Sequence, residues 1–221
     1  MIETFETGSM LADAAADAVA ARLRAGLADR GRASLVATGG RSPGPIYDRL
    51  AGIELDWAHV AVTLSDERQV DAGSPNSNAR LLRERLFQAH AAHARFLPLT
   101  DYAEPALAKL MPFDAVLLGM GEDGHIASLI PGSPVLEAAM DPDGAALTAE
   151  SPQGFGSPPV PRITLTLAAL LRSRAIFLLI AGELKRQVIA KAQSGEALPV
   201  RAILAQDRVP VRIFWAERFE D

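Results

Sequence analysis

The chain has 221 residues and no cysteine, which excludes disulfide bonds, thiolate catalysis and cysteine-ligated metals. Hydrophobic residues make up 49% of it and charged residues 22%, a globular composition that argues against intrinsic disorder. The formal net charge of -5 provides no long-range attraction to nucleic acid or to an anionic membrane. An anionic ligand would therefore need a local cluster of basic side chains.

The first residues and the strongest apolar run favour a cytoplasmic protein. Glu3, Glu6 and Asp13 stand where a secretory signal would carry basic residues. The apolar run at 175–181 is far too short to span a bilayer. We therefore expect no membrane partner and no nucleic-acid partner.

The predicted elements alternate between apolar runs and helices. An alanine-rich amphipathic helix over about 9–29 comes first, and Gly31 is its stop signal. Apolar runs follow at 33–37, 60–64, 115–118, 175–180 and 211–215. Between them we expect a helix to Leu50, helices at about 77–87 and 183–192, and a short helix ending near Pro131. The order predicts an α/β fold, a mainly parallel sheet with helices on both faces, in a single domain over 1–221. The glycine- and proline-rich stretch 141–161 is interpreted as an excursion from it.

Ligands of such sheets bind outside the carboxyl ends of the strands, where the predicted loops would share one crevice. In the first loop, Gly39 and Gly40 let the backbone approach a ligand, and the following helix start offers free amides to an anion. Ser42 adds a hydroxyl donor, and Arg41 a charge that can pair with phosphate. A tight turn with a solvated arginine is the alternative.

The second loop, residues 65–68, places three charged residues directly after an apolar run. A solvated strand end explains such a cluster by itself. Its position matters because Arg68 would point into the same crevice as Arg41. Further on, Ser77 is interpreted as the N-cap of a helix.

The third loop formally matches G-x-G-x-x-G after a strand, at residues 119–124. We reject a dinucleotide site, because Glu122 and Asp123 would place carboxylates beside a pyrophosphate. Acid–base chemistry by Asp123 and His125 is the better interpretation, since a carboxylate can fix the imidazole tautomer and raise its basicity. A metal site using the same two residues lacks a clear third ligand.

Lys185 is expected in the first turn of a helix, where the helix dipole disfavours a cation. A bound phosphate would resolve that conflict. An ordinary surface lysine is the alternative.

Several segments together resemble the 6-phosphogluconolactonase family, within the wider glucosamine-6-phosphate isomerase/lactonase fold. They are ATGGRSPGPIYDRL, TLSDERQVDAGSPNSNARLLRERL, FDAVLLGMGEDGHIASLIPGSP, PRITLTLAALLRSRAIFLLIAGELKRQVI and LPVRAIL, in family order from about Ala33 onward. The segments GMGEDGHIASLIPG and SDER…SNAR are the specific ones. Two positions depart from the family's commonest pattern: serine and threonine are frequent where Arg41-Ser42 stands, and threonine where Ile126 stands.

The resemblance implies hydrolysis of 6-phospho-D-glucono-1,5-lactone to 6-phospho-D-gluconate, the second step of the oxidative pentose phosphate pathway. It implies that His125 is the general base and that Asp123 is its neighbour. No metal or cofactor is expected, and the partner is a phosphorylated sugar lactone, bound by a monomer or a small homo-oligomer. The implied substrate-binding residues are Gly39, Gly40, Arg41, Ser42, Arg68, Arg162 and Lys185.

Two alternatives stay open. A glucosamine-6-phosphate deaminase or isomerase shares the fold, but residues 127–131 and Arg68 resemble the lactonase version. A non-catalytic sugar-phosphate-binding regulator would generally carry a DNA-binding module, and the net negative charge argues against one.

Overall fold

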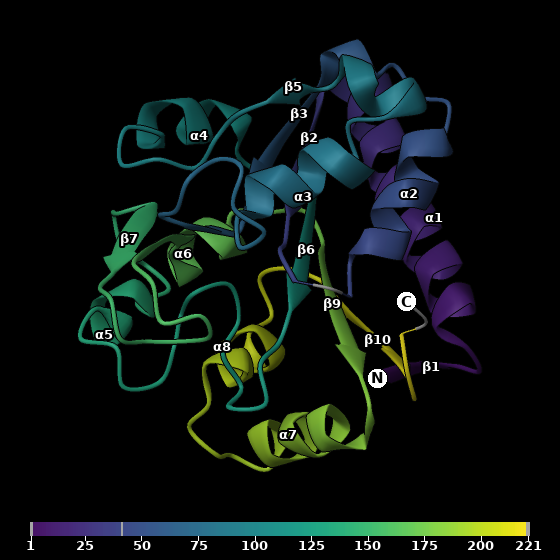
Figure 1. Ribbon diagram of the computed structural model, residues 1–221. Coiled ribbons are helices and arrows are strands. Elements are labelled where there is room, and N and C mark those ends of the chain that lie inside the picture. The colour runs from purple at the N-terminus through teal and green to yellow at the C-terminus, as the bar shows by residue number, and fades with distance from the viewer. Residues whose placement is uncertain (1, 41, 220–221) are drawn as a thin grey trace.

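The computed structural model describes residues 2–40 and 42–219, and a seven-stranded sheet runs through its centre (Figure 1). The strand order is β1-β10-β9-β6-β2-β3-β5, and every neighbouring pair in this sheet is parallel. The strands are β1 (Ile2–Phe5), β2 (Ala33–Ala37), β3 (Val60–Leu64), β5 (Arg95–Phe96), β6 (Ala115–Gly119), β9 (Ile176–Ala181) and β10 (Val211–Ala216).

Helices cover both faces of this sheet. The α1 and α2 helices pack together on one side, to the right in Figure 1, and α6 and α8 lie on the other. The helices are α1 (Gly8–Arg30), α2 (Gly44–Gly52), α3 (Asn78–Arg85), α4 (Glu104–Leu110), α5 (Leu136–Ala139), α6 (Leu167–Leu171), α7 (Glu183–Gln193) and α8 (Pro199–Ala205). The predicted fold class, a mainly parallel α/β sheet with helices on both faces, is confirmed.

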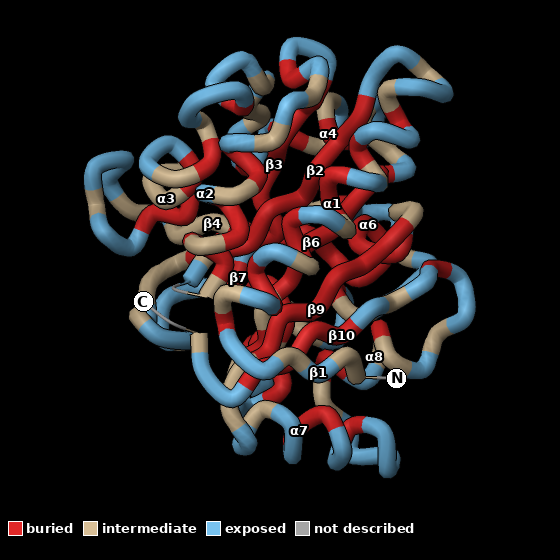
Figure 2. Tube along the Cα trace, turned by 90° about the vertical axis from the view of Figure 1, so that its right-hand side faces the viewer, coloured by how far each residue is buried: buried red, intermediate tan, exposed pale blue. Residues whose placement is uncertain are grey.

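The central strands are buried over nearly their whole length (Figure 2). Every residue of β2 and β3 is buried, as expected of parallel strands that are covered on both faces. The α1 helix packs on β2, β6 and β10, and the alanine and glycine residues on its buried side bring its axis close to the sheet. Both ends of α1 carry capping residues. Thr7 Oγ1 accepts from Met10 N at 3.1 Å, and Gly31 ends the helix with φ 66°.

A second, antiparallel sheet adjoins the first, in the order β4-β8-β7. It consists of β4 (Asp66–Arg68), β7 (Thr148–Ser151) and β8 (Arg162–Leu165). Our interpretation of 65–68 as a loop was therefore wrong from Asp66 onward. Its charged residues pair with β8, so tertiary hydrogen bonding outweighs their low strand propensity.

The short helix expected before Pro131 is also absent from the described residues. The backbone there turns twice into the left-handed region, at Gly124 (φ 77°) and Ala127 (φ 49°), and a right-handed helix cannot continue through either. Isolated bridges join Met120 to Ile126 and Ile126 to Leu129, so the segment is a compact double turn.

Across residues 2–40 and 42–219, no helix combines the length and apolar character needed to cross a bilayer.

Candidate active site

A cavity of about 290 Å³ opens at the carboxyl ends of the central strands. Seven of the predicted site residues line it: Gly39, Gly40, Ser42, Arg68, His125, Arg162 and Lys185. Asp123 does not line the cavity but contacts His125, while Arg41 is outside the described residues. The other lining residues are Thr38, Pro43, Asp66, Gly119, Met120, Gly121, Ala127, Ser157 and Leu179.

The loop after β2 is fixed at its start by a buried tyrosine of α2. Tyr47 Oη donates to Thr38 O at 2.6 Å and accepts from Thr38 N at 2.8 Å, and burial raises the pKa of this phenol far above its usual range. A Cβ on Gly39 would collide with the side chain of Asn78. Close packing against Asn78 therefore explains why a glycine stands here, and no ligand is needed to explain it. Gly40 has φ 94°, a conformation that glycine adopts without strain.

Two guanidinium groups form one wall of the cavity. Arg68 and Arg162 are paired residues of the antiparallel strands β4 and β8, so their side chains lie on the same face. Their Nε atoms are both buried and have no hydrogen-bond partner among the described residues. Burial and the nearby charge of Arg68 lower the pKa of Arg162, and Asp66 partly opposes that shift. An anion bound between the two guanidinium groups would relieve this repulsion and satisfy the unpaired donors.

Asp66 is a site residue that our sequence reasoning missed. Its side chain is buried, accepts from Ser128 Oγ at 2.6 Å and lies 3.8 Å from Arg162 Nη1. Ser128 Oγ also accepts from Arg162 Nη1 at 3.3 Å. The charged run after β3 was the available signal, but only the antiparallel pairing turns the carboxylate toward Arg162. Ser157, in an irregular loop, gave no signal.

His125 and Asp123 form a hydrogen-bonded pair at the edge of the cavity. His125 Nδ1 lies 2.6 Å from Asp123 Oδ1, which also accepts from the backbone N of His125 at 3.2 Å. With Nδ1 donating to the carboxylate, Nε2 is the ring nitrogen that can accept a proton. Gly121 makes room for this arrangement: a Cβ there would collide with the imidazole and the carboxylate.

Lys185 is the third residue of α7, and it is half-buried in the cavity wall. The helix begins after Gly182, which has φ 83° and whose carbonyl accepts from Trp215 Nε1 at 3.0 Å. Lys185 therefore adds a cation to the cavity wall shortly after β9. It does so at the start of a helix, where free backbone amides also favour an anionic ligand.

The lining residues include three cationic side chains, Arg68, Arg162 and Lys185, against the single carboxylate of Asp66. This excess of positive charge favours an anionic ligand, although the chain has a net charge of -5. Within the described residues, no three histidine, aspartate or glutamate side chains are grouped to hold a metal ion.

The carboxylate of Glu67 anchors the α3 helix beside this cavity. It accepts from Asn78 N and Ala79 N, both at 2.8 Å, and from Ser77 Oγ at 3.2 Å. Ser77 is the N-cap, as predicted, and its Oγ accepts from Arg80 N at 3.2 Å.

We expect Glu67→Gln to lower the free energy of unfolding by about 1–2 kcal/mol, because an amide replaces one of two accepting oxygens at the helix start. Urea unfolding measures it. Glu84→Gln is the matched control: it removes only a surface i,i+4 pair with Arg80, worth at most about 0.5 kcal/mol. Equal losses in the two variants would contradict the anchoring role.

The fold and the cavity together define an α/β enzyme that acts on a small anionic substrate. Residues 6–215 match the family model described as glucosamine-6-phosphate isomerases/6-phosphogluconolactonase. The chain belongs to this family.

Individual relatives are similar over nearly the whole chain. The 6-phosphogluconolactonase of Caulobacter vibrioides is 42% identical over 226 residues, covering 98% of this chain and 97% of that protein. The 6-phosphogluconolactonase of Rhizobium meliloti is 42% identical, covering 96% and 97% respectively. A crystal structure of a 6-phosphogluconolactonase from Shewanella baltica superposes with a TM-score of 0.89 at 38% identity, covering 98% of this chain and 97% of that one.

Proposed function

We propose that this chain hydrolyses 6-phospho-D-glucono-1,5-lactone to 6-phospho-D-gluconate. The observation that carries the proposal is the placement of His125 Nδ1 on Asp123, with the imidazole facing the same cavity as Arg68, Arg162 and Lys185. One end of this cavity suits a phosphate dianion and the other offers a base. The full-length similarity to several 6-phosphogluconolactonases favours the same reaction.

The orientation of the substrate follows from a second groove. Gly40, Ser42, Arg68, Ser157 and Lys185 line both the cavity and an adjoining groove that continues toward α3, whereas His125 and Arg162 line only the cavity. We therefore assign the phosphate to the shared wall, with Lys185 and Ser42 as donors. The lactone ring then extends toward His125.

In the chemical step His125 Nε2 takes a proton from water, and the water oxygen bonds to the lactone carbonyl carbon. The resulting oxyanion is stabilised by donors of the cavity wall, for which the guanidinium of Arg162 is the candidate. The tetrahedral intermediate collapses, the bond from the carbonyl carbon to the ring oxygen breaks, and the imidazolium returns its proton to that oxygen. Asp123 acts through His125 as a positioning residue.

Turnover of freshly made 6-phosphogluconolactone tests this function. Product formation is coupled to 6-phosphogluconate dehydrogenase and corrected for spontaneous hydrolysis. We expect saturable turnover well above the spontaneous rate; a rate equal to the spontaneous one would overturn the proposal. Ammonia release from glucosamine 6-phosphate, which we expect to be undetectable, would instead identify a deaminase.

Replacement of Lys185 by alanine should weaken substrate binding more than chemistry. A charge-assisted hydrogen bond to phosphate is worth about 1.5–3 kcal/mol, so we expect KM to rise about 10- to 100-fold with kcat within a few-fold. Steady-state kinetics of Lys185→Ala check this. Lys191→Ala, on an exposed position of the same helix, is the matched control. An unchanged KM in the Lys185 variant would remove this residue from the phosphate site.

A single domain, a monomeric or small homo-oligomeric state, a cytoplasmic location and the absence of nucleic-acid and membrane partners stay predictions from the sequence.

A further inference from the structure

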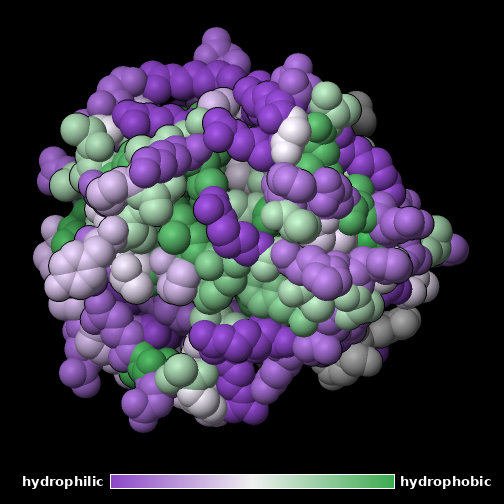
Figure 3. Space-filling model, turned by 90° about the horizontal axis from the view of Figure 1, so that it is seen from above, coloured by the Kyte–Doolittle hydropathy of each residue, from purple (hydrophilic) through white to green (hydrophobic). Residues whose placement is uncertain are grey.

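A larger cavity, of about 530 Å³, lies at the opposite edge of the central sheet. It is bounded by the first residues of β2 and β3, by β5, by the end of α4 and by the segment that leads into β6. Figure 3 views the molecule from this side and shows a hollow with an apolar floor, bordered by hydrophilic side chains. The strands separate it from the site of His125, so the two cavities can be occupied independently.

Five cationic side chains line this cavity, and Asp114 supplies its one carboxylate. Two of the five are held by that carboxylate: Arg30 forms an ion pair with it, and Arg174 Nε lies 3.5 Å from Asp114 Oδ1. Asp114 is buried and also accepts from Ser34 N at 2.9 Å. Asp29 Oδ2 also lies 2.7 Å from Arg30 Nη1, so two carboxylates stand beside these two arginines, which we count as part of the framework.

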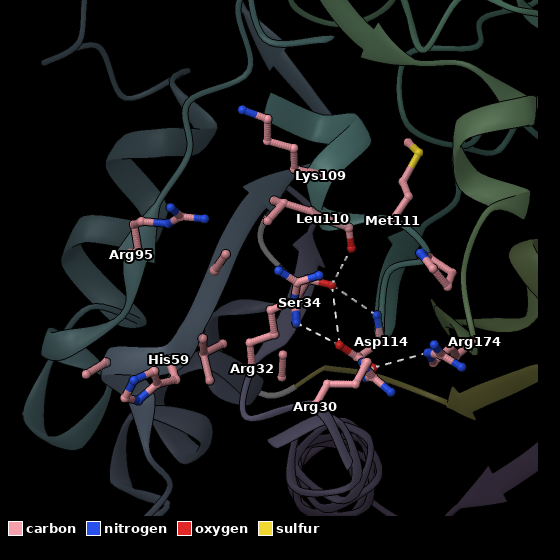
Figure 4. A pocket seen from close by; sticks show the side chains of 15 residues that line it. Arg30, Arg32, Ser34, His59, Arg95, Lys109, Leu110, Met111, Asp114 and Arg174 are labelled. Atoms are coloured by element: carbon pink, nitrogen blue, oxygen red, sulfur yellow. Dashed lines mark hydrogen bonds and ion pairs between the residues drawn. The ribbon is translucent and has the colours of Figure 1, made fainter. Parts of the chain in front are cut away.

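The other three cations, Arg32, Arg95 and Lys109, are exposed, and no described carboxylate lies within ion-pair distance of any of them. They come from three different elements: the residue before β2, the strand β5 and the helix α4. In Figure 4 Arg32 lies in the middle of the view, between Arg95 on one side and Asp114 with Arg174 on the other. Like charges that line one cavity raise each other's energy, and a bound polyanion relieves that cost.

Apart from Ser34 and His59, the rest of the lining is apolar. Ala33, Val60 and Ala61 form part of it, and Leu110, Met111 and Pro112 form another. Pockets of this size that combine apolar surface with a few charges are typical of small-molecule sites. His59 is not counted among the anion donors, because its Nδ1 is paired with Asp56 at 2.8 Å.

We propose that this cavity binds a small metabolite with a diphosphate group and an apolar, planar body, of the nucleoside diphosphate class. A single phosphoryl group carries only about -1.5 to -2 charges near neutral pH, so one phosphate does not balance three unpaired cations, whereas a diphosphate does. The methionine, proline and aliphatic surface contacts the planar body, and the guanidinium of Arg32 can stack on it.

Calorimetric titration with ADP tests the proposal. We expect saturable binding to the wild-type chain, weakened at least 10-fold by the double substitution Arg95→Gln/Lys109→Gln. Raising the salt concentration should weaken binding as well, because the three cations are exposed. Inorganic pyrophosphate, which lacks the planar body, should bind more weakly than ADP.

Two single variants separate this site from other anion sites. Lys185→Ala alters the cavity of His125 and should leave ADP binding unchanged, as should Lys191→Gln, a matched loss of charge on an exposed face. Lactone turnover of the double variant should equal that of the wild type. No saturable binding at millimolar ADP, or equal binding by the double variant, would overturn the site. Equal affinity for pyrophosphate and ADP would overturn the nucleoside part of the proposal.

Discussion

The His125→Ala variant is expected to lose about 10²–10⁴-fold in kcat, with KM changed only a few-fold. The magnitude is that of a positioned general base, and KM is spared because the phosphate donors are untouched. The coupled lactone assay measures both constants, provided that spontaneous hydrolysis is subtracted at each substrate concentration.

His59→Ala is the matched control for that experiment. Like His125, His59 has its Nδ1 paired with a nearby aspartate, here Asp56. His59 lies at the opposite edge of the sheet. The same substitution there should leave lactone turnover unchanged. Wild-type kcat in the His125 variant would remove the imidazole from the chemical step.

The second large effect is expected from Gly121→Ala, which adds one methyl group. Its Cβ would collide with His125 Nδ1 and with the Asp123 carboxylate, so the imidazole must move from its position. A misplacement of about 1 Å in a catalytic group can cost about 10²-fold in rate, and we expect a loss of kcat of that order. The phosphate contacts stay in place, so KM should change little.

Gly52→Ala serves as the control for the Gly121 variant. Gly52 ends α2, and a Cβ there meets no atom within 4 Å. The control should keep wild-type kinetics, and thermal unfolding should show that both variants fold. A folded Gly121→Ala variant with wild-type kcat would contradict the claim that this pair must be held in its observed geometry.

The sheet was predictable because its strands are buried on both faces. Parallel strands of this kind read as unbroken apolar runs, and the predicted runs at 33–37 and 60–64 coincide with β2 and β3. The edge strand β1 was missed, since its sequence Ile-Glu-Thr-Phe is half polar and only partly buried. Its pairing with β10 is a contact between the two ends of the chain, which local sequence does not encode.

The candidate site was partly predictable for a related reason. Gly40, His125 and Lys185 follow the carboxyl ends of predicted strands, and that rule alone places them in one crevice. Arg162 could be named only through the family resemblance, because its place beside Arg68 depends on the antiparallel pairing of β4 with β8. The buried carboxylate of Asp66 was missed for the same reason. The left-handed backbone of Ala127 had no signal, because alanine rarely adopts it.

A crystal structure of the chain with bound 6-phosphogluconate would show in which direction the substrate lies in the cavity. We expect the phosphate against Lys185 and Ser42, and the C1 carboxylate within hydrogen-bond distance of His125 Nε2. A product molecule bound in the reverse direction, or one whose carboxylate lies away from His125, would contradict this expectation.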